Sequence, residues 1–190
     1  ALRRAGGAIH KIFFLILESV MFTKCLIESI DTHTAGNPTR NLVAGVPTIH
    51  GSTMQEKMQY AREHLDWVRT VTMLEPRGHS NMSGTIWVPP CNPEAHMGIL
   101  FIDAGGHMPM CGHSTIGCVT AMLESGRVPI TGEVTEVNID TPAGLVRTRA
   151  TVENGRVKSV PIYDYLREHR DDYTYFRTDH HWTAKGAFYA

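Results

Sequence analysis

The stretch of the chain on which the fold depends is Met110-Cys111-Gly112-His113-Ser114-Thr115-Ile116-Gly117. It follows a turn at Gly105-Gly106 and opens a run with helical spacing that ends at Gly126. The members of this run are Ile116, Val119, Thr120, Met122 and Leu123. The spacing predicts a helix over residues 112–125, with Cys111 at its first turn.

The position of Cys111 suggests a chemical role for its thiol. Backbone N–H groups at a helix start have no partners within the helix, and the helix dipole favours negative charge there. A thiol in this place tends towards the thiolate, which can act as a base or nucleophile. The same N–H groups can hold a carboxylate. Taken alone, the residues fit a buried structural cysteine that caps a core helix equally well.

The same segment resembles the first catalytic motif of the proline racemase family, which also includes hydroxyproline epimerases and trans-3-hydroxyproline dehydratases. Three further blocks similar to the family stand upstream in the right order, and in the first of them Asn37 replaces the usual Glu before the proline. The resemblance runs from about Met21 to about Val160 and covers only the N-terminal half of a family member. The blocks are Asp31-Thr32-His33-Thr34-Ala35-Gly36-Asn37-Pro38-Thr39-Arg40, Gly51-Ser52-Thr53-Met54-Gln55-Glu56-Lys57 and Glu75-Pro76-Arg77-Gly78-His79.

The resemblance implies both a fold and an activity. The fold is α+β and diaminopimelate epimerase-like, with a mixed, barrel-like sheet around a central helix, here residues 112–125. The activity is that of a cofactor-independent racemase or epimerase of proline or hydroxyproline, in which Cys111 transfers a proton at Cα. Gly112 and His113 correspond to the residues that hold the substrate carboxylate. Neither pyridoxal phosphate nor a metal is implied.

Inversion at Cα requires a second acid or base on the opposite face of the carbon. In the family this group comes from an Asp-x-x-Pro-Cys-Gly-Thr motif in the C-terminal half, and this sequence has no such motif. Cys118 is a poor substitute, because on the same helix it lies roughly 10 Å from Cys111 along one face. Cys91, in a proline-rich loop, is no better placed. We therefore expect half of an active site.

Composition excludes several other functions. The chain has 190 residues with a formal net charge of −1 and no basic run, which argues against nucleic-acid binding. Its hydrophobic and charged fractions, 42% and 19%, are typical of a soluble globular domain. The histidines and cysteines show no metal-ligand spacing, and no signal peptide is visible. We expect free thiols, a cytoplasmic location, no membrane partner and a small-molecule substrate.

The rest of the chain alternates between strand and helix patterns. Ser52 and Gln55 form a capping-box pattern, and a Met-rich stripe predicts a helix from Met54 to about Thr70. Asn154-Gly155 is a strong turn signal for a hairpin. The solvated face of the helix would include Arg62, Glu63 and Arg69. Strands are predicted within residues 22–43, 86–88, 97–102, 134–139, 145–152 and 156–160, which gives an α+β order.

The two ends lie outside the family resemblance. Residues 1–20 contain an apolar run over 12–17 that is shorter than the roughly 20 residues a membrane span needs, so we expect a leader or terminal helix. Residues 161–190 contain Tyr175-Phe176-Arg177-Thr178-Asp179-His180-His181-Trp182-Thr183, and this tail resembles a fragment of the DHHW family, related to alginate-type acetyltransferases. No serine nucleophile accompanies Asp179 and His181, so we expect no function for them. A fusion, a fragment and a misassembled gene all fit this pattern.

The leading interpretation is a racemase or epimerase that retains its first-base half, residues 21–160. Two alternatives are a dehydratase-type relative, which needs one cysteine, and a non-catalytic single-lobe binding domain. Cys111 is expected to be the most reactive thiol, because Cys25 and Cys118 look buried and Cys91 inert. A lobe without its partner lobe should also expose an apolar face and self-associate.

Overall fold

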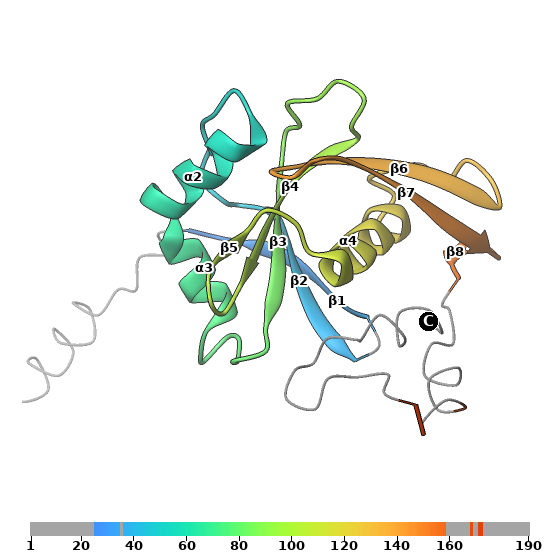
Figure 1. Ribbon diagram of the computed structural model, residues 1–190, viewed down its shortest axis with the longest axis horizontal. Coiled ribbons are helices and arrows are strands. Elements are labelled where there is room, and N and C mark those ends of the chain that lie inside the picture. The colour runs from blue at the N-terminus through green and yellow to red at the C-terminus, as the bar shows by residue number, and fades with distance from the viewer. Residues whose placement is uncertain (1–24, 35, 159–167, 169–170, 173–190) are drawn as a thin grey trace, which may run out of the picture.

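A single curled sheet forms the framework of the protein. The computed structural model describes residues 25–34, 36–158, 168 and 171–172. Within these, the strands form an eight-stranded sheet in the order β1-β2-β3-β4-β6-β7-β8, with β5 paired to β4 (Figure 1). The strands are β1 (Glu28–Thr34), β2 (Asn37–Ala44), β3 (Ser83–Val88), β4 (Met97–Asp103), β5 (His107–Met108), β6 (Val134–Thr141), β7 (Gly144–Glu153) and β8 (Arg156–Val157).

The strand directions are mixed, and the helices account for this. Consecutive strands β1 and β2, β3 and β4, and β6 and β7 pair antiparallel, whereas β2 with β3 and β4 with β6 pair parallel. A parallel pair needs a long crossover connection. Helices α2 (Met54–His64) and α3 (Asp66–Met73) supply the first crossover, and α4 (Gly112–Glu124) belongs to the second. The predicted mixed sheet is confirmed.

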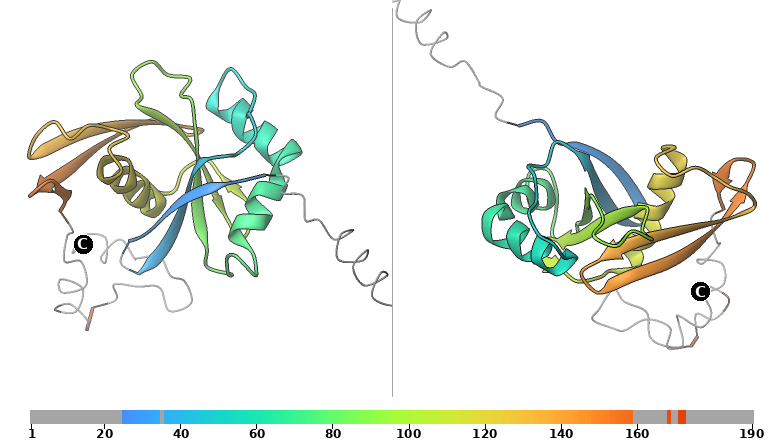
Figure 2. Two further views of the ribbon diagram at one scale, coloured as in Figure 1. Left: turned by 180° about the vertical axis from the view of Figure 1, so that it is seen from behind. Right: turned by 90° about the horizontal axis from the view of Figure 1, so that it is seen from above.

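Helix α4 lies in the hollow of the curled sheet, and α2 and α3 cover the opposite face of β3 and β4 (Figures 1 and 2). Successive side chains of β4 point to opposite faces of the sheet, and the side chains on both faces are buried. Ile99 and Phe101 pack with Met122 of α4, while Leu100 and Ile102 join the core under α2 and α3. The predicted central helix over residues 112–125 is therefore confirmed, ending at Glu124.

The N-terminus of α2 differs from the prediction by one residue. Thr53, rather than Ser52, is the N-cap, and its hydroxyl accepts a hydrogen bond from the N–H of Glu56 at 3.1 Å. The carboxylate of Glu56 in turn accepts from the N–H of Ser52 at 2.7 Å. A charged Glu56 interacts more favourably with the positive end of the helix than the neutral Gln55 does, which explains the shift.

The long helix predicted to reach Thr70 is interrupted at Leu65, whose backbone leaves the helical region (φ −129, ψ 19). The break turns α3 so that Arg69 points inward. Its side chain is only 12% exposed, pairs with Asp66 at 2.7 Å and donates to the carbonyl of Ala104 at 2.9 Å. The prediction of a solvated Arg69 was therefore wrong, because helical periodicity does not carry across a broken turn.

The first strand is less buried than its apolar residues suggest. Leu26 is 71% exposed and precedes the strand, and Cys25 is exposed rather than buried. Ile27 and Ile30 are half-buried. The reason is topological, since β1 stands at the end of the strand order and has one neighbour, β2.

The turn between β7 and β8 has the predicted form. Asn154 and Gly155 both adopt positive φ, 53 and 76, as a tight two-residue hairpin turn requires. The expected leader over residues 1–20 lies outside the described residues. So does the DHHW-like tail over 161–190, apart from residues 168 and 171–172.

Candidate functional site

Cys111 is the N-cap residue of α4 and has an extended backbone (φ −140, ψ 116). Its carbonyl accepts hydrogen bonds from the N–H and the hydroxyl of Thr115, at 2.9 and 2.8 Å. The segment before it is tied to the sheet by the pairing of β5 with β4. The carboxylate of Asp103 also accepts hydrogen bonds from the N–H groups of Gly105 and Gly106, each at 2.7 Å. Strand, turn and helix together fix the sulfur at one end of α4.

The ring of His113 is held by the β1–β2 hairpin. Its Nε2 lies 3.0 Å from the carbonyl of Asn37 and 3.2 Å from the hydroxyl of Thr39. Its Nδ1 lies 3.4 Å from the side-chain nitrogen of Asn37 and 3.9 Å from the sulfur of Cys111. The hydroxyl of Thr34 donates to the carbonyl of the same histidine at 3.3 Å. The imidazole therefore links the start of α4 to the hairpin.

The electrostatic surroundings favour ionisation of Cys111. Burial acts to raise the pKa of its thiol, but hydrogen bonds with His113 and Ser114 outweigh this and lower the pKa from 9.0 to about 7. Burial likewise acts to lower the pKa of His113, yet its contacts with Cys111 and the Asn37 carbonyl raise it overall. A lowered thiol pKa and a raised imidazole pKa together favour a thiolate beside an imidazolium.

The first turn of α4 offers donors for an anion. The N–H groups of Gly112 and His113 come before the first intrahelical hydrogen bond, which runs from Thr115 to Cys111, whereas the N–H of Ser114 interacts with the sulfur of Cys111. A Cβ placed on Gly112 would meet no atom of the described chain within 4 Å, so the space beside it is open. Ser114 is fully buried, and its hydroxyl makes no hydrogen bond of ordinary geometry to another described residue. It is nevertheless close enough to Cys111 to contribute to the lowered pKa.

The other three cysteines occupy different surroundings. Cys118 is fully buried beside Thr85 and Trp87, and burial raises the pKa of its thiol to about 12. Cys25 and Cys91 are exposed, Cys25 before β1 and Cys91 in the loop between β3 and β4. All four thiols are free. The pKa of Cys111 is thus shifted in the opposite direction to that of Cys118.

Three residues of this site are not among those that the sequence predicts for it. Asn37 and Thr39 reach His113 from β2, and the Ser114 hydroxyl interacts with the thiol of Cys111. The only sign of a role for Asn37 in the sequence is that it replaces a Glu that is usual in the family. Thr39 and Ser114 carry no such signal, because small polar residues are common in strands and at helix starts.

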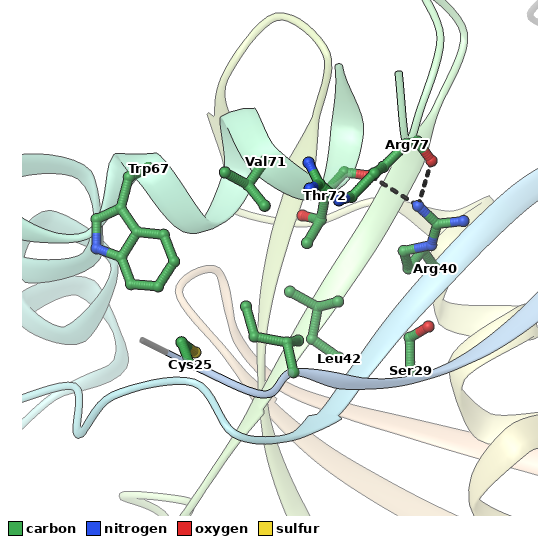
Figure 3. Close-up of a pocket in the computed structure, with 9 residues that line it drawn as sticks. Cys25, Ser29, Arg40, Leu42, Trp67, Val71, Thr72 and Arg77 are labelled. Carbon is green, nitrogen blue, oxygen red and sulfur yellow. Dashed lines mark hydrogen bonds between the residues drawn. The ribbon is translucent and has the colours of Figure 1, made fainter. Parts of the chain in front are cut away.

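A separate groove of about 520 Å³ lies on the other face of the sheet, between β1, β2 and α3 (Figure 3). Arg40 faces it, whereas its neighbour Thr39 faces α4, as expected for successive strand residues. The guanidinium of Arg40 donates to the carbonyl of Thr72 at 2.9 Å and pairs with Asp31 at 2.7 Å. These partners give Arg40 a structural role in joining β2 to α3.

The described residues contain no group of three His, Cys, Asp or Glu side chains arranged to hold a metal ion. None of the described helices has the length and apolar character needed to cross a membrane.

Comparison with solved structures places the described fold among proline racemase-like proteins. A probable proline racemase from Agrobacterium radiobacter with bound carbonate superposes with a TM-score of 0.67 at 32% identity. A hydroxyproline epimerase from Agrobacterium vitis with bound trans-4-hydroxy-L-proline gives 0.66 at 26% identity. The matches cover 70% and 69% of this chain but 40% and 39% of the two structures.

Sequence comparison agrees. The proline racemase of Clostridioides difficile is 50% identical over 134 residues, 70% of this chain and 40% of the relative. The 4-hydroxyproline 2-epimerase of Streptosporangium roseum is 47% identical over 142 residues, 75% of this chain and 43% of the relative. This chain thus spans about two fifths of the length of these relatives. The proline racemase family profile matches residues 29–168, and the chain belongs to the proline racemase family.

Proposed function

We propose that the chain provides the first-base half of a cofactor-independent proline racemase or hydroxyproline epimerase. The observation that carries this proposal is the Cys111 thiol at the N-cap of α4, beside His113, with a pKa lowered to about 7. A thiol with this pKa is partly ionised at neutral pH, which suits a group that both takes and returns protons.

The substrate carboxylate would bind to the backbone N–H groups at the start of α4. Gly112 provides open space for it, and the N–H of His113 points from the same turn. The imidazole of His113 is already engaged by the β1–β2 hairpin, so we assign carboxylate binding to the backbone of this residue. Negative charge that develops on the carboxylate during proton removal is stabilised by the same N–H groups.

In the forward step the thiolate of Cys111 takes the Cα proton and becomes a thiol, and the electron pair of the broken C–H bond moves towards the carboxylate. Inversion then needs an acid that delivers a proton to the opposite face. Cys118 is fully buried with a pKa raised to about 12, which makes it unsuitable. Neither Cys25 nor Cys91 lies on α4 or on the β1–β2 hairpin that holds His113. The second acid would therefore come from another polypeptide segment.

The proposal predicts a separation of two activities. The chain should exchange the α-proton of L-proline or trans-4-hydroxy-L-proline slowly with solvent, because removal and return on one face need only Cys111. It should not invert the stereocentre, because a half-site open to water lacks a positioned second acid. NMR in heavy water measures the exchange as uptake of deuterium at Cα, and polarimetry measures the inversion.

Variants separate the outcomes of this experiment. Cys111→Ser should abolish the exchange, and Cys91→Ser, which removes an exposed thiol elsewhere, should leave it unchanged. Absence of exchange in the unaltered chain would contradict the assignment of Cys111 as the first base. Rapid inversion that is lost in Cys111→Ser would show that this chain contains a second acid.

A further inference from the structure

Asn37 contacts both nitrogens of the His113 ring. Its backbone carbonyl lies 3.0 Å from Nε2, and its side-chain nitrogen lies 3.4 Å from Nδ1. Asn37 is 76 residues from His113 in the chain and stands at the first position of β2. One hairpin residue thus fixes both the position and the orientation of the imidazole.

The carbonyl of Asn37 decides where the ring carries its hydrogen. A carbonyl oxygen can only accept a hydrogen bond, so an Nε2 atom at 3.0 Å must be protonated. An unprotonated Nε2 would set two lone pairs against each other at this distance. The Thr39 hydroxyl, 3.2 Å away, can serve as a second acceptor for the same proton. In the neutral imidazole Nδ1 is then the unprotonated atom, and this is the nitrogen that faces the sulfur at 3.9 Å.

We propose that Asn37 is a positioning residue that holds His113 as the Nε2–H tautomer, so that Nδ1 can accept the proton of the Cys111 thiol. The inference deepens the proposed function, because it assigns the step that generates the base. The proton leaves Sγ and binds Nδ1, which turns a neutral thiol–imidazole pair into a thiolate–imidazolium pair with no change in net charge. Among the described groups that contact the ring, Cys111 is the only ionisable one, and the hairpin supplies the uncharged Asn37 and Thr39.

The amide side chain suits both states of the pair. While Nδ1 is unprotonated, the NH2 group of Asn37 can donate to it, and once Nδ1 carries a proton, a rotated amide can accept through its oxygen. A carboxylate at this position could only accept, so it would favour the imidazolium throughout. An amide therefore lets the proton move in either direction between Sγ of Cys111 and Nδ1 of His113. Cys111 needs this reversibility if it acts as both base and acid.

The tautomer can be measured directly in Cys111→Ser, whose hydroxyl stands in for the protonated thiol and does not ionise at high pH. With ¹⁵N-labelled histidine, NMR of this variant at high pH, where the ring is neutral, should show His113 protonated at Nε2, with the signal assigned by its loss when His113→Gln is added. A ring protonated at Nδ1 would overturn the proposal. This measurement involves no substrate, so its outcome does not depend on whether the chain catalyses α-proton exchange.

Substitution of Asn37 tests the effect on the thiol. The rate of iodoacetamide labelling of Cys111, followed against pH by mass spectrometry, should give a midpoint near 7 in the unaltered chain. Asn37→Ala should move the midpoint about one pH unit higher and slow labelling at neutral pH about fivefold, because the ring loses the side-chain partner that orients its Nδ1, while the backbone carbonyl stays in contact with Nε2. Asn37→Asp, which retains an acceptor, should raise the pKa of His113 in the NMR titration.

The matched control is His33→Gln, which alters an exposed residue of the same hairpin. It should leave the labelling midpoint unchanged. Circular dichroism shows whether each variant remains folded, and the tautomer measurement stands even if Asn37→Ala does not fold. A folded Asn37→Ala with the midpoint of the unaltered chain would contradict the proposal.

Discussion

At the scale of single residues, the reactivity of Cys111 depends on two close neighbours rather than on the helix start alone. Burial raises the pKa of the thiol, and the side-chain hydrogen bond with His113 is the largest of the interactions that lower it, followed by the hydrogen bonds with Ser114. Below a pH of about 7 the thiol holds its proton, so the rate of alkylation should fall about tenfold for each unit of pH. Limiting iodoacetamide at neutral pH should therefore label Cys111 before the exposed Cys25 and Cys91, as measured by peptide mass spectrometry.

Ser114→Ala provides a sharper form of this test. Loss of the hydroxyl should raise the pKa of Cys111 and slow its labelling, whereas the free energy of unfolding should stay the same or rise. The second effect is expected because the variant removes a buried hydroxyl that lacks a partner of good geometry. Preferential labelling of Cys25 or Cys91 in the unaltered chain would contradict the assignment of Cys111 as the reactive thiol.

At the scale of elements, the close approach of α4 to the β1–β2 hairpin depends on Gly117. A Cβ at this position would lie 2.5 Å from the hydroxyl of Thr32 and 3.3 Å from the side chain of Thr39. Gly117→Ala should therefore lower the free energy of unfolding by about 1–3 kcal/mol, as overpacking does. It should also slow labelling of Cys111, because displacement of Thr39 moves His113. Urea denaturation measures the first effect.

Gly112→Ala is the matched control for stability, since it makes the same change in the same helix where a Cβ meets nothing within 4 Å. Alanine is also the better helix former, so this variant should be as stable as the unaltered chain or slightly more stable. Equal stability of the two variants would show that the hairpin does not pack closely on α4.

At the scale of the whole molecule, large apolar side chains beside the site remain exposed. Met110 is 40% exposed and Ile116 is 52% exposed, and the two flank Cys111 on the same segment. Large exposed apolar side chains beside a functional site commonly mark a surface that another protein segment covers. We expect the chain to self-associate at high concentration, as measured by light scattering coupled to size-exclusion chromatography.

Ile116→Ser should weaken this association. Val134→Ser should have a smaller effect, because Val134 is equally exposed, at 56%, but lies at the start of β6 rather than on α4. A monodisperse monomer at high concentration would contradict the prediction, and so would an association that Ile116→Ser leaves unchanged.

The sequence by itself determined the features that depend on neighbouring residues. The period of apolar residues after Cys111 predicted α4 to within one residue, and Asn154-Gly155 predicted the hairpin turn. The motif around Cys111 identified the family. These features were predictable because helix periodicity and turn conformation are decided by hydrogen bonds and side chains a few residues apart.

Only the tertiary structure decided which distant side chains meet. The register of β2 brings Asn37 and Thr39 to His113 across more than seventy residues, and no local pattern encodes that contact. The same holds for Arg69, which turns inward because α3 starts anew after Leu65 and carbonyls at the end of β4 can accept from it. The burial of Cys118 and the partial burial of Cys111 likewise follow from how α4 sits in the sheet. Burial raises the pKa of the Cys118 thiol, whereas at Cys111 hydrogen bonds with His113 and Ser114 outweigh burial and lower the pKa.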